Sequence, residues 1–323
     1  MSAHEVLTQH ILPYWLSLRD PLHGGFYGQV LGDETVVPDA PRGAILYARI
    51  LWAFSASYRE LGNPACLEAA DAARHFIERY MQNPESKAAY WSVEADGRPL
   101  DTTVHTVVQA YMLYAYSEYV RATHDAAAMQ TALTLYRFIE THKADCDEDT
   151  CLHIMEAYTN FYRVLPDETV KNAVRALIDR FATQPHAHFN PGHCIECAWL
   201  LDEAAEVAGV RCDALVRQLM EEAEQGFNAD GTLDDREWWK QAEAVMGYCH
   251  LYLRNQDTAA LDRARALWQL IVSRYVDAEH GEWYWLLRPD GTPDKTKDKV
   301  SFWKCPYHNA RLCLYLTVNR IAL

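Results

Sequence analysis

The chain has 323 residues, half of them hydrophobic, and its 30 basic and 45 acidic side chains give a formal net charge of −15. This acidic balance disfavours binding to nucleic acids or to anionic membranes, and it makes a strongly anionic substrate a poor match. The N-terminal residues show no basic region followed by an apolar stretch, so no secretory signal is expected, and no segment is apolar for long enough to span a bilayer. The nine cysteines have no spacing typical of a disulfide framework. We therefore expect reduced thiols in a cytoplasmic protein. For its oligomeric state we expect a monomer or a homodimer.

Apolar residues recur at three- and four-residue steps along most of the chain, and breaks rich in Gly, Pro or Asp separate the periodic segments. This pattern predicts a succession of amphipathic helices. The expected helices cover residues 3–19, 42–61, 64–83, 103–123, 126–142, 149–164, 167–183, 191–209, 211–225, 237–254, 258–276 and 305–323.

Three segments between these helices resemble one another. They read GGFYGQVLGDE (24–34), AAYWSVEADGRPLD (88–101) and GEWYWLLRPDGTPD (281–294), and each joins an aromatic, strand-prone run to a turn that contains glycine and aspartate. Such segments predict short β-hairpins. Helix pairs with recurring hairpins between them indicate an all-α (α/α)6 barrel. Because no linker rich in serine or glycine divides the chain, we expect residues 1–323 to form a single catalytic domain.

A barrel of this kind has a central funnel lined by residues near the ends of its inner helices, so candidate catalytic residues are sought near helix starts. His308 follows Pro306 at the start of the last expected helix. Proline favours the first turn of a helix, and a helix N-terminus favours the neutral imidazole that can act as a base. The alternative is a hydrogen-bonded structural histidine.

His193 is placed in the same way, directly after a break formed by Asn190, Pro191 and Gly192. Glu196 and Trp199 follow at three-residue steps, so the three side chains share one helical face. A carboxylate one turn from an imidazole orients it or raises its basicity. The alternative is a surface ion pair beside a tryptophan that packs in the core.

Cys194 and Cys197 form a CxxC pair on the same expected helix, which raises the possibility of a zinc or redox site. The chain has no second CxxC and no βαβ pattern around this one. We therefore interpret both cysteines as buried packing residues. The sequence shows no other metal-ligand spacing and no phosphate-binding loop, so neither a metal nor another cofactor is expected.

Three weaker signals lie on other expected helices. His153 stands one turn after Asp149, and Arg49 stands alone in an apolar helix, where it must either form a salt bridge or present a donor to a cavity. Trp239 and Glu243 are four residues apart and share a helical face. Tryptophan faces commonly stack on the C–H surfaces of sugars, although core packing is the simpler role for either of two adjacent tryptophans.

Five motifs together resemble one known family. WKCPYHNAR, GHCIECAW, HIMEAYT, WWKQAEAV and RGAILYARILWAFS are similar to segments of the N-acylglucosamine 2-epimerase superfamily, and above all to its branch of cellobiose and mannose 2-epimerases. The likeness extends from His10 to the C-terminus. It implies an (α/α)6 barrel without a metal, which opens a sugar ring and removes the C2 proton. That proton then returns either to the opposite face of C2 or to C1.

The resemblance also assigns roles to matching positions. It implies that His308 and His193 are an acid/base pair on the two sides of C2, and that Glu196 is the carboxylate beside the second histidine. The implied substrate-binding residues are Arg49 and His153 at O1 and O2, Glu243 as a further carboxylate, and Trp199, Trp239 and Trp303 as stacking or wall residues. Asp149 stands where the family more often has an amide.

The leading hypothesis is a 2-epimerase that interconverts glucose- and mannose-configured neutral reducing sugars. The alternatives are an aldose–ketose isomerase of the mannose/fructose type, an (α/α)6 glycoside hydrolase, which needs two carboxylates that flank the scissile bond, and a carbohydrate-binding barrel without activity. The segments on either side of His153 are shorter than in the disaccharide enzymes. We therefore expect a preference for monosaccharides.

Overall fold

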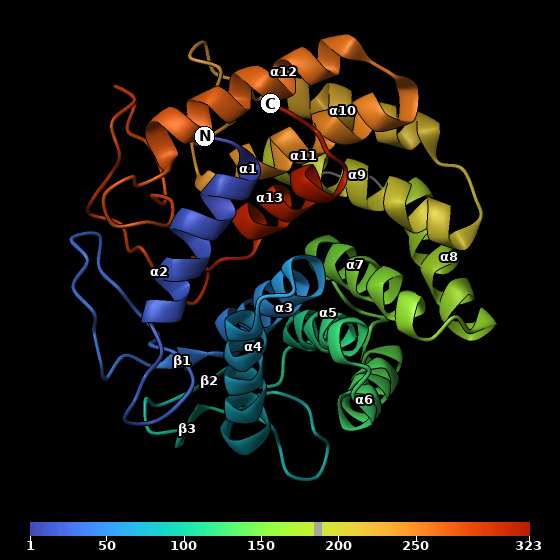
Figure 1. Ribbon diagram of the computed structural model, residues 1–323. Helices are drawn as coiled ribbons and strands as arrows, with labels where there is room; N and C mark the ends of the chain where they lie inside the picture. The colour runs from blue at the N-terminus through green and yellow to red at the C-terminus, as the bar shows by residue number, and fades with distance from the viewer. Residues whose placement is uncertain (184–188) are drawn as a thin grey trace. The chain divides into compact units, whose positions relative to one another are not determined.

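The computed structural model describes residues 1–183 and 189–323. The chain forms two compact units, each described here by itself. Unit 1 contains Met1–Tyr14, Ile178–Lys297 and His308–Leu323, and unit 2 contains Trp15–Leu177 and Asp298–Tyr307. Both units are predominantly helical (Figure 1).

Unit 2 is built on a row of three helices. In this row α5 (Thr106–Thr123) packs between α3 (Ala44–Leu61) and α7 (Glu148–Val164), while α4 (Pro64–Phe76) packs on α3 and α6 (Ala126–His142) packs on α5. Figure 1 shows α4 and α6 on the outer side of this row. The helices of the row are buried over most of their length, whereas α4 and α6 each bury a single stripe of five residues. This difference is the one expected between inner and outer helices.

Unit 1 repeats this arrangement. Its inner helices are α9 (Pro191–Ala208), α11 (Trp238–Asn255) and α13 (His308–Val318), with α11 in contact with both others. α10 (Asp213–Glu224) packs on α9, α12 (Thr258–Leu270) packs on α11, and α1 (Ala3–Glu5) packs on α13. The remaining helices are α2 (Leu12–Ser17) and α8 (Glu168–Thr183), and π-helical turns η1 (Val6–Ile11), η2 (Ile77–Met81) and η3 (Ile271–Tyr275) continue α1, α4 and α12.

The hairpin predicted over residues 88–101 is present and contributes two strands to a small antiparallel sheet. The sheet has the order β1 (Arg42–Gly43), β2 (Ser92–Val93), β3 (Pro99–Asp101). In the regions of the other two predicted hairpins, both among the described residues, the backbone forms only single β-bridges and no continuous strands. One is the bridge between Val30 and Val36, and the 281–294 segment contains the bridge between Leu287 and Pro293.

Three inner helices are tied to the preceding hairpin segment by the same device. A side chain four residues after the N-cap hydrogen-bonds both the N–H and the C=O of one residue in that segment. The pairs are Tyr47 with Phe26 before α3, Gln109 with Ala89 before α5, and Gln241 with Leu233 before α11. Each pair fixes where its helix begins, and therefore where the side chains of the first turns lie.

The predicted helix 305–323 is too long at both ends. The helix begins at His308, so Pro306 precedes it and does not lie in its first turn. It ends at Val318 because Arg320 adopts a φ of 54° and the backbone N–H of Ile321 donates to the C=O of Leu316 (3.0 Å). A left-handed residue just past the last turn is a common helix stop, but glycine usually provides it.

Candidate active site

Four buried side chains from the three inner helices of unit 1 form one charged cluster. Glu243 Oε1, on α11, accepts hydrogen bonds from His308 Nδ1 (2.7 Å) and from Arg311 Nη2 (2.8 Å), both on α13. Glu196, on α9, accepts from the same Arg311 nitrogen (3.0 Å), and its Oε1 lies 4.0 Å from His308 Nδ1. The cluster thus places one guanidinium between two carboxylates and one imidazole against both.

Trp199 completes this cluster on the α9 side. Its Nε1 donates to Glu243 Oε2 (2.9 Å), and the guanidinium of Arg311 lies 4.8 Å from the centre of its ring. Trp199 is 4% exposed. Because the tryptophan is buried against the charged cluster, its hydrogen bond to Glu243 is its evident role here, and its resemblance-based role as a sugar platform stays a prediction.

The charge state of Glu243 determines which nitrogen of His308 is available. Burial alone would raise the pKa of this carboxyl group, but the Arg311 guanidinium and the hydrogen bond from His308 outweigh burial and lower the pKa. An ionised carboxylate only accepts hydrogen bonds, so His308 Nδ1 must carry the proton. In neutral His308 the unprotonated ring nitrogen is therefore Nε2, the nitrogen that would act as a general base.

His193 begins the other half of this arrangement at the start of α9. The side chain of Asn190 caps the helix by accepting from the backbone N–H of His193 (3.0 Å), and Pro191 occupies the first turn. The imidazole of His193 lies 4.9 Å from the indole of Trp239, and this indole lies 5.5 Å from the imidazole of His308 (centroid distances). One tryptophan therefore contacts both histidines that the sequence predicts as bases.

The cluster also contains the donors of a possible metal site that sequence spacing did not reveal. Glu196, Glu243 and His308 each present a ligand atom, and these atoms lie within 4.8 Å of one another. However, Arg311 hydrogen-bonds both carboxylates and supplies the positive charge that balances them. The donor set is thus engaged in hydrogen bonds within the protein.

Unit 2 contains the second group of predicted residues, centred on Arg49 in α3. Arg49 is 5% exposed, and its Nη2 donates to the hydroxyl of Tyr111 (2.7 Å). Its Nη1 donates to the backbone C=O of Trp303 (3.4 Å) and lies 3.8 Å from Cys305 Sγ. The rings of Tyr111 and Tyr307 lie 4.4 and 4.9 Å from the guanidinium carbon.

Arg49 has no carboxylate partner among the described residues, and its buried Nε has no hydrogen-bond partner there. The sequence left two interpretations open for this arginine, and the structure removes the salt-bridged one. A buried guanidinium that is held by hydroxyl, carbonyl and aromatic groups keeps its full positive charge. This arrangement fits a donor for a substrate oxygen that becomes negative.

His153 lies beside Arg49 through Tyr111, whose ring is 4.6 Å from the imidazole. Its Nδ1 lies 3.1 Å from Glu156 Oε2, and Glu156 Oε1 accepts from the hydroxyl of Tyr307. Asp149 is at the outer end, with its carboxylate 3.8 Å from His153 Nε2 and its side chain half exposed. The expected proximity of Asp149 and His153 is thus present.

Trp303 is 45% exposed, and its ring lies 5.8 Å from the Arg49 guanidinium and 6.2 Å from Trp91. Trp303 also lines a cavity of about 360 Å³ in unit 2. Trp303 is thus an exposed tryptophan beside Arg49, and its role as a sugar-stacking residue stays a prediction.

Sequence reasoning missed several residues that hold these groups together. Arg311 follows His308 by three residues and stands alone in an apolar helix, which is the signal that identified Arg49. Glu156 follows His153 by three residues, a spacing that was used for His193 and Glu196 but not here. Tyr111 and Tyr307 carry no such signal, because nothing in the sequence distinguishes them from the many other tyrosines.

The CxxC prediction agrees with the structure. Cys194 and Cys197 are buried in α9, and none of the nine cysteines, all of which lie in the described part of the chain, forms a disulfide.

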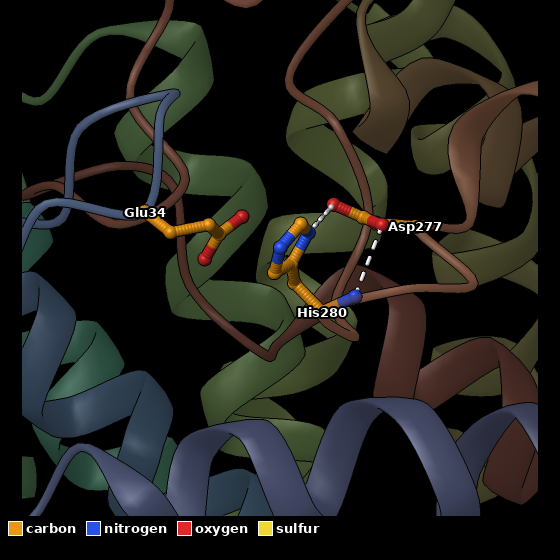
Figure 2. A group of neighbouring side chains, drawn as sticks. All are labelled: Glu34, Asp277 and His280. Carbon is orange, nitrogen blue, oxygen red and sulfur yellow. Dashed lines mark hydrogen bonds and ion pairs between the residues drawn. The ribbon is translucent and has the colours of Figure 1, made fainter.

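A separate polar group lies at the turn before the 281–294 segment, where Asp277 accepts from the backbone N–H of His280 (3.2 Å) and its other oxygen lies 3.3 Å from His280 Nδ1 (Figure 2). Glu34, drawn with them, belongs to unit 2 and pairs there with Lys299 (2.9 Å).

Comparisons with known proteins agree on one family. The sequence profile of N-acylglucosamine 2-epimerase (GlcNAc 2-epimerase) matches residues 25–179 and 152–310. A cellobiose 2-epimerase of Bacteroides fragilis is 34% identical over 377 aligned positions, which cover 96% of each chain. Because the alignment is longer than this chain, the relative has segments that this chain lacks.

Solved structures show the same fold. Cellobiose 2-epimerase from Bacillus thermoamylovorans matches with a TM-score of 0.91 at 33% identity, over 99% of this chain and 98% of the other. A D-mannose isomerase structure matches with a TM-score of 0.85 at 18% identity, over 98% and 97%. The fold class is therefore the predicted all-α (α/α)6 barrel. Among the described residues, no helix is long and apolar enough to cross a membrane.

Proposed function

Because the chain belongs to the N-acylglucosamine 2-epimerase family, and within it to the cellobiose 2-epimerase branch, we propose that it is a 2-epimerase that interconverts glucose- and mannose-configured reducing sugars. The observation that carries this proposal is the pair of imidazoles in unit 1 that share the indole of Trp239. Epimerisation at C2 requires a base on one face of the carbon and an acid on the other, and two histidines near neutral pH can exchange these tasks.

The reaction proceeds from the open-chain sugar, in which C2–H is acidic because it lies next to the C1 aldehyde. One histidine takes the C2 proton, the C–H electrons move into an enediolate, and the other histidine returns a proton to the opposite face. For His308 the base is Nε2, because Glu243 holds the proton on Nδ1. When His308 becomes an imidazolium, Glu243 and the nearby Glu196 stabilise the new positive charge, as carboxylates do for catalytic histidines.

Arg49 is proposed to stabilise the enediolate. The negative charge develops on the sugar oxygens O1 and O2, and a buried guanidinium that has no anionic partner in the described part of the chain favours that charge. His153, fixed by Glu156, is proposed to hydrogen-bond the same oxygens, and Trp239 and Trp303 are proposed to contact the apolar faces of the sugar.

An aldose–ketose isomerase is the second candidate. It uses the same enediolate but returns the proton to C1, and the likeness to a D-mannose isomerase in fold makes it worth testing directly. The hydrolase alternative is weaker, because Glu196 and Glu243 both hydrogen-bond Arg311 and are therefore not placed as a separate acid and nucleophile.

Incubation of the protein with glucose, mannose, fructose, cellobiose and lactose in D2O, followed by NMR, separates these reactions. The proposal predicts epimer formation with deuterium at C2 of the product. A ketose product would favour the isomerase instead. If the folded protein gave no epimer, no ketose and no deuterium exchange with any of these sugars, the enediolate mechanism would be refuted.

We also propose that catalysis needs no metal, because Arg311 already balances the buried carboxylates and an imidazole whose nitrogen ligates a metal could not take a proton from C2. Dialysis against EDTA should leave the epimerisation rate unchanged, whereas a loss of activity that zinc or manganese restores would identify Glu196, Glu243 and His308 as ligands.

The two compact units are further proposed to act as one domain, which predicts a single cooperative unfolding transition.

A further inference from the structure

Glu237 precedes α11 as its N-cap residue, but its carboxylate does not accept hydrogen bonds from the backbone N–H groups of the first turn of that helix. Instead, Oε2 accepts from Nε1 of Trp239 (2.7 Å) and Oε1 accepts from Nε1 of Trp285 (3.1 Å). An N-cap carboxylate commonly satisfies its own helix. Here its two oxygens are used to hold two indoles.

One of these indoles is fixed independently. Trp285 lies in the 281–294 segment, its backbone C=O accepts from the N–H of Trp238 (2.8 Å), and its ring packs edge-to-face on that of Trp238 (5.3 Å between centroids). The carboxylate of Glu237 therefore bonds to a rigid donor with one oxygen, which leaves little freedom for the other. The backbone bridge between Glu237 and Leu286 adds to this restraint.

The other indole belongs to the residue that contacts both proposed bases. Trp239 lies against the imidazoles of His193 and His308, and it is only half buried. The start of α9 also approaches it closely, since a Cβ on Gly192 would lie 3.0 Å from the edge of the Trp239 ring. A rotation of this indole would therefore disturb the surroundings of both histidines at once.

We propose that Glu237 is a positioning residue for catalysis: it fixes the plane of Trp239 and thereby the separation of the two imidazoles. This inference rests on the proposed epimerase function for its kinetic consequence, but the position of the indole can be measured without substrate. Glu237 touches no reacting atom in this account and acts only through Trp239.

The bidentate geometry gives a specific prediction for glutamine at this position. The Glu237→Gln side chain has one carbonyl oxygen and one NH2 group, so it can accept from one indole N–H while its NH2 faces the other N–H donor. Replacing Trp285 by phenylalanine removes the second donor and leaves the ring. In the double variant Glu237→Gln/Trp285→Phe, the carbonyl is then free to accept from Trp239.

The experiment compares the wild type with Glu237→Gln, Trp285→Phe and the double variant, with mannose as substrate. We expect Glu237→Gln to lower kcat about tenfold, the scale of one lost hydrogen bond to a charged acceptor, and to change KM less than about threefold. Trp285→Phe alone should stay within about threefold of wild type, and the double variant should recover to that level.

The same series distinguishes positioning from a charge effect. Lys240 Nζ lies 3.9 Å from Glu237 Oε2, but it also pairs with Asp234 (2.7 Å) and Asp235 (2.9 Å). If the negative charge of Glu237 were what matters, the double variant would remain as impaired as Glu237→Gln, and the positioning role would be wrong. An impaired Trp285→Phe variant with intact Trp239 contacts would also contradict it.

A readout without substrate separates this inference from the proposed function. In protein labelled with 5-fluorotryptophan, the ¹⁹F resonance that disappears in Trp239→Phe reports the surroundings of Trp239. It should shift in Glu237→Gln and return toward its wild-type position in the double variant. An unshifted resonance in folded Glu237→Gln would overturn the positioning role, whatever the enzyme's substrate. If Glu237→Gln does not fold, the resonance in Trp285→Phe and in the double variant decides, since both should stay near the wild-type position.

Discussion

Two buried arginines in this chain have opposite surroundings. Arg311 in unit 1 donates to two carboxylates, Glu196 and Glu243, and packs on Trp199. Arg49 in unit 2 donates to the hydroxyl of Tyr111 and to a backbone carbonyl and lies between tyrosine rings, with no carboxylate partner among the described residues. Both side chains are about equally inaccessible to solvent.

The difference indicates different tasks. Arg311 is balanced by negative charge within the protein, so its cation organises the carboxylates and, through Glu243, orients His308. Arg49 keeps an uncompensated charge, which is costly in the resting protein and favourable when an enediolate forms. Substitutions at the two positions should therefore separate folding stability from catalysis.

The largest expected effect is on stability and concerns Arg311. Arg311→Met leaves two buried carboxylates without their cation, and we expect a loss of about 3–5 kcal/mol in the free energy of unfolding. The matched variant Arg49→Met leaves no carboxylate behind and should cost about 1–2 kcal/mol, from lost hydrogen bonds. Urea unfolding measures both, and equal losses would remove the contrast between the two arginines.

The next effect is on catalysis and concerns Arg49. Arg49→Met should lower kcat about 10²- to 10³-fold, the scale for loss of a donor to a developing oxyanion. Arg49→Lys keeps the charge and should retain part of the activity. Initial rates with mannose test this order, and a folded Arg49→Met variant with wild-type kcat would exclude an oxyanion role.

Glu243→Gln tests the control of the His308 tautomer. The amide can also donate to Nδ1, which would move the proton of neutral His308 to Nε2 and remove the base, so we expect kcat to fall about 10²-fold. The carboxyl pKa of Glu243 is lowered in the folded protein, so its contribution to stability is present above the ordinary glutamate pKa of about 4.3. This contribution is lost as the pH falls through the lowered value. The stability difference between wild type and Glu243→Gln should therefore shrink on acidification, and urea unfolding at pH 7 and pH 3.5 measures it.

The smallest effect concerns the size of the sugar. The relative from Bacteroides fragilis has segments that this chain lacks. The family resemblance implies that the missing stretches flank His153, and residues 184–188, between His153 and His193, lie outside the described residues. We propose a preference for monosaccharides of about tenfold in kcat/KM, the scale of a few lost contacts. Mannose and cellobiose compared under the same conditions test it, and a preference for cellobiose would show that other segments hold the second sugar ring.

Helix positions were predictable from sequence where caps and breaks are strong. The helix at 126–142 has the predicted bounds because Asp125 caps it, and α9 begins at Pro191 because Asn190 accepts from His193 N–H. The end of the last helix was not predictable, because a left-handed arginine stops it where the sequence offers no glycine. The π-helical turns also have no signature in the apolar periodicity.

In the candidate site, some neighbours on the same helix were predictable, whereas contacts between side chains of different helices were not. Trp239 and Glu243 were expected on one face, and they do meet His308 together. Glu196 was expected beside the histidine of its own helix, but its proximity to His308 and its hydrogen bond with Arg311, both on α13, were not expected. Helical spacing predicts which side chains are neighbours on one helix. Contacts between helices depend on the angle and offset at which the helices cross, and these cannot be read from residue spacing in a single sequence.

The central claim is that His193 and His308 act on opposite faces of C2. If each is the base for one epimer and the acid for the other, His193→Asn and His308→Asn should each lose net epimerisation by about 10²-fold or more.

The decisive measurement is C2–H washout in D2O for both variants with both epimers, followed by NMR. We expect washout to survive better than epimerisation, and asymmetrically, with one variant exchanging the glucose-configured sugar and the other the mannose-configured sugar. Near-wild-type epimerisation in either folded variant, or equal loss of epimerisation and exchange with both sugars in both variants, would contradict the two-base account.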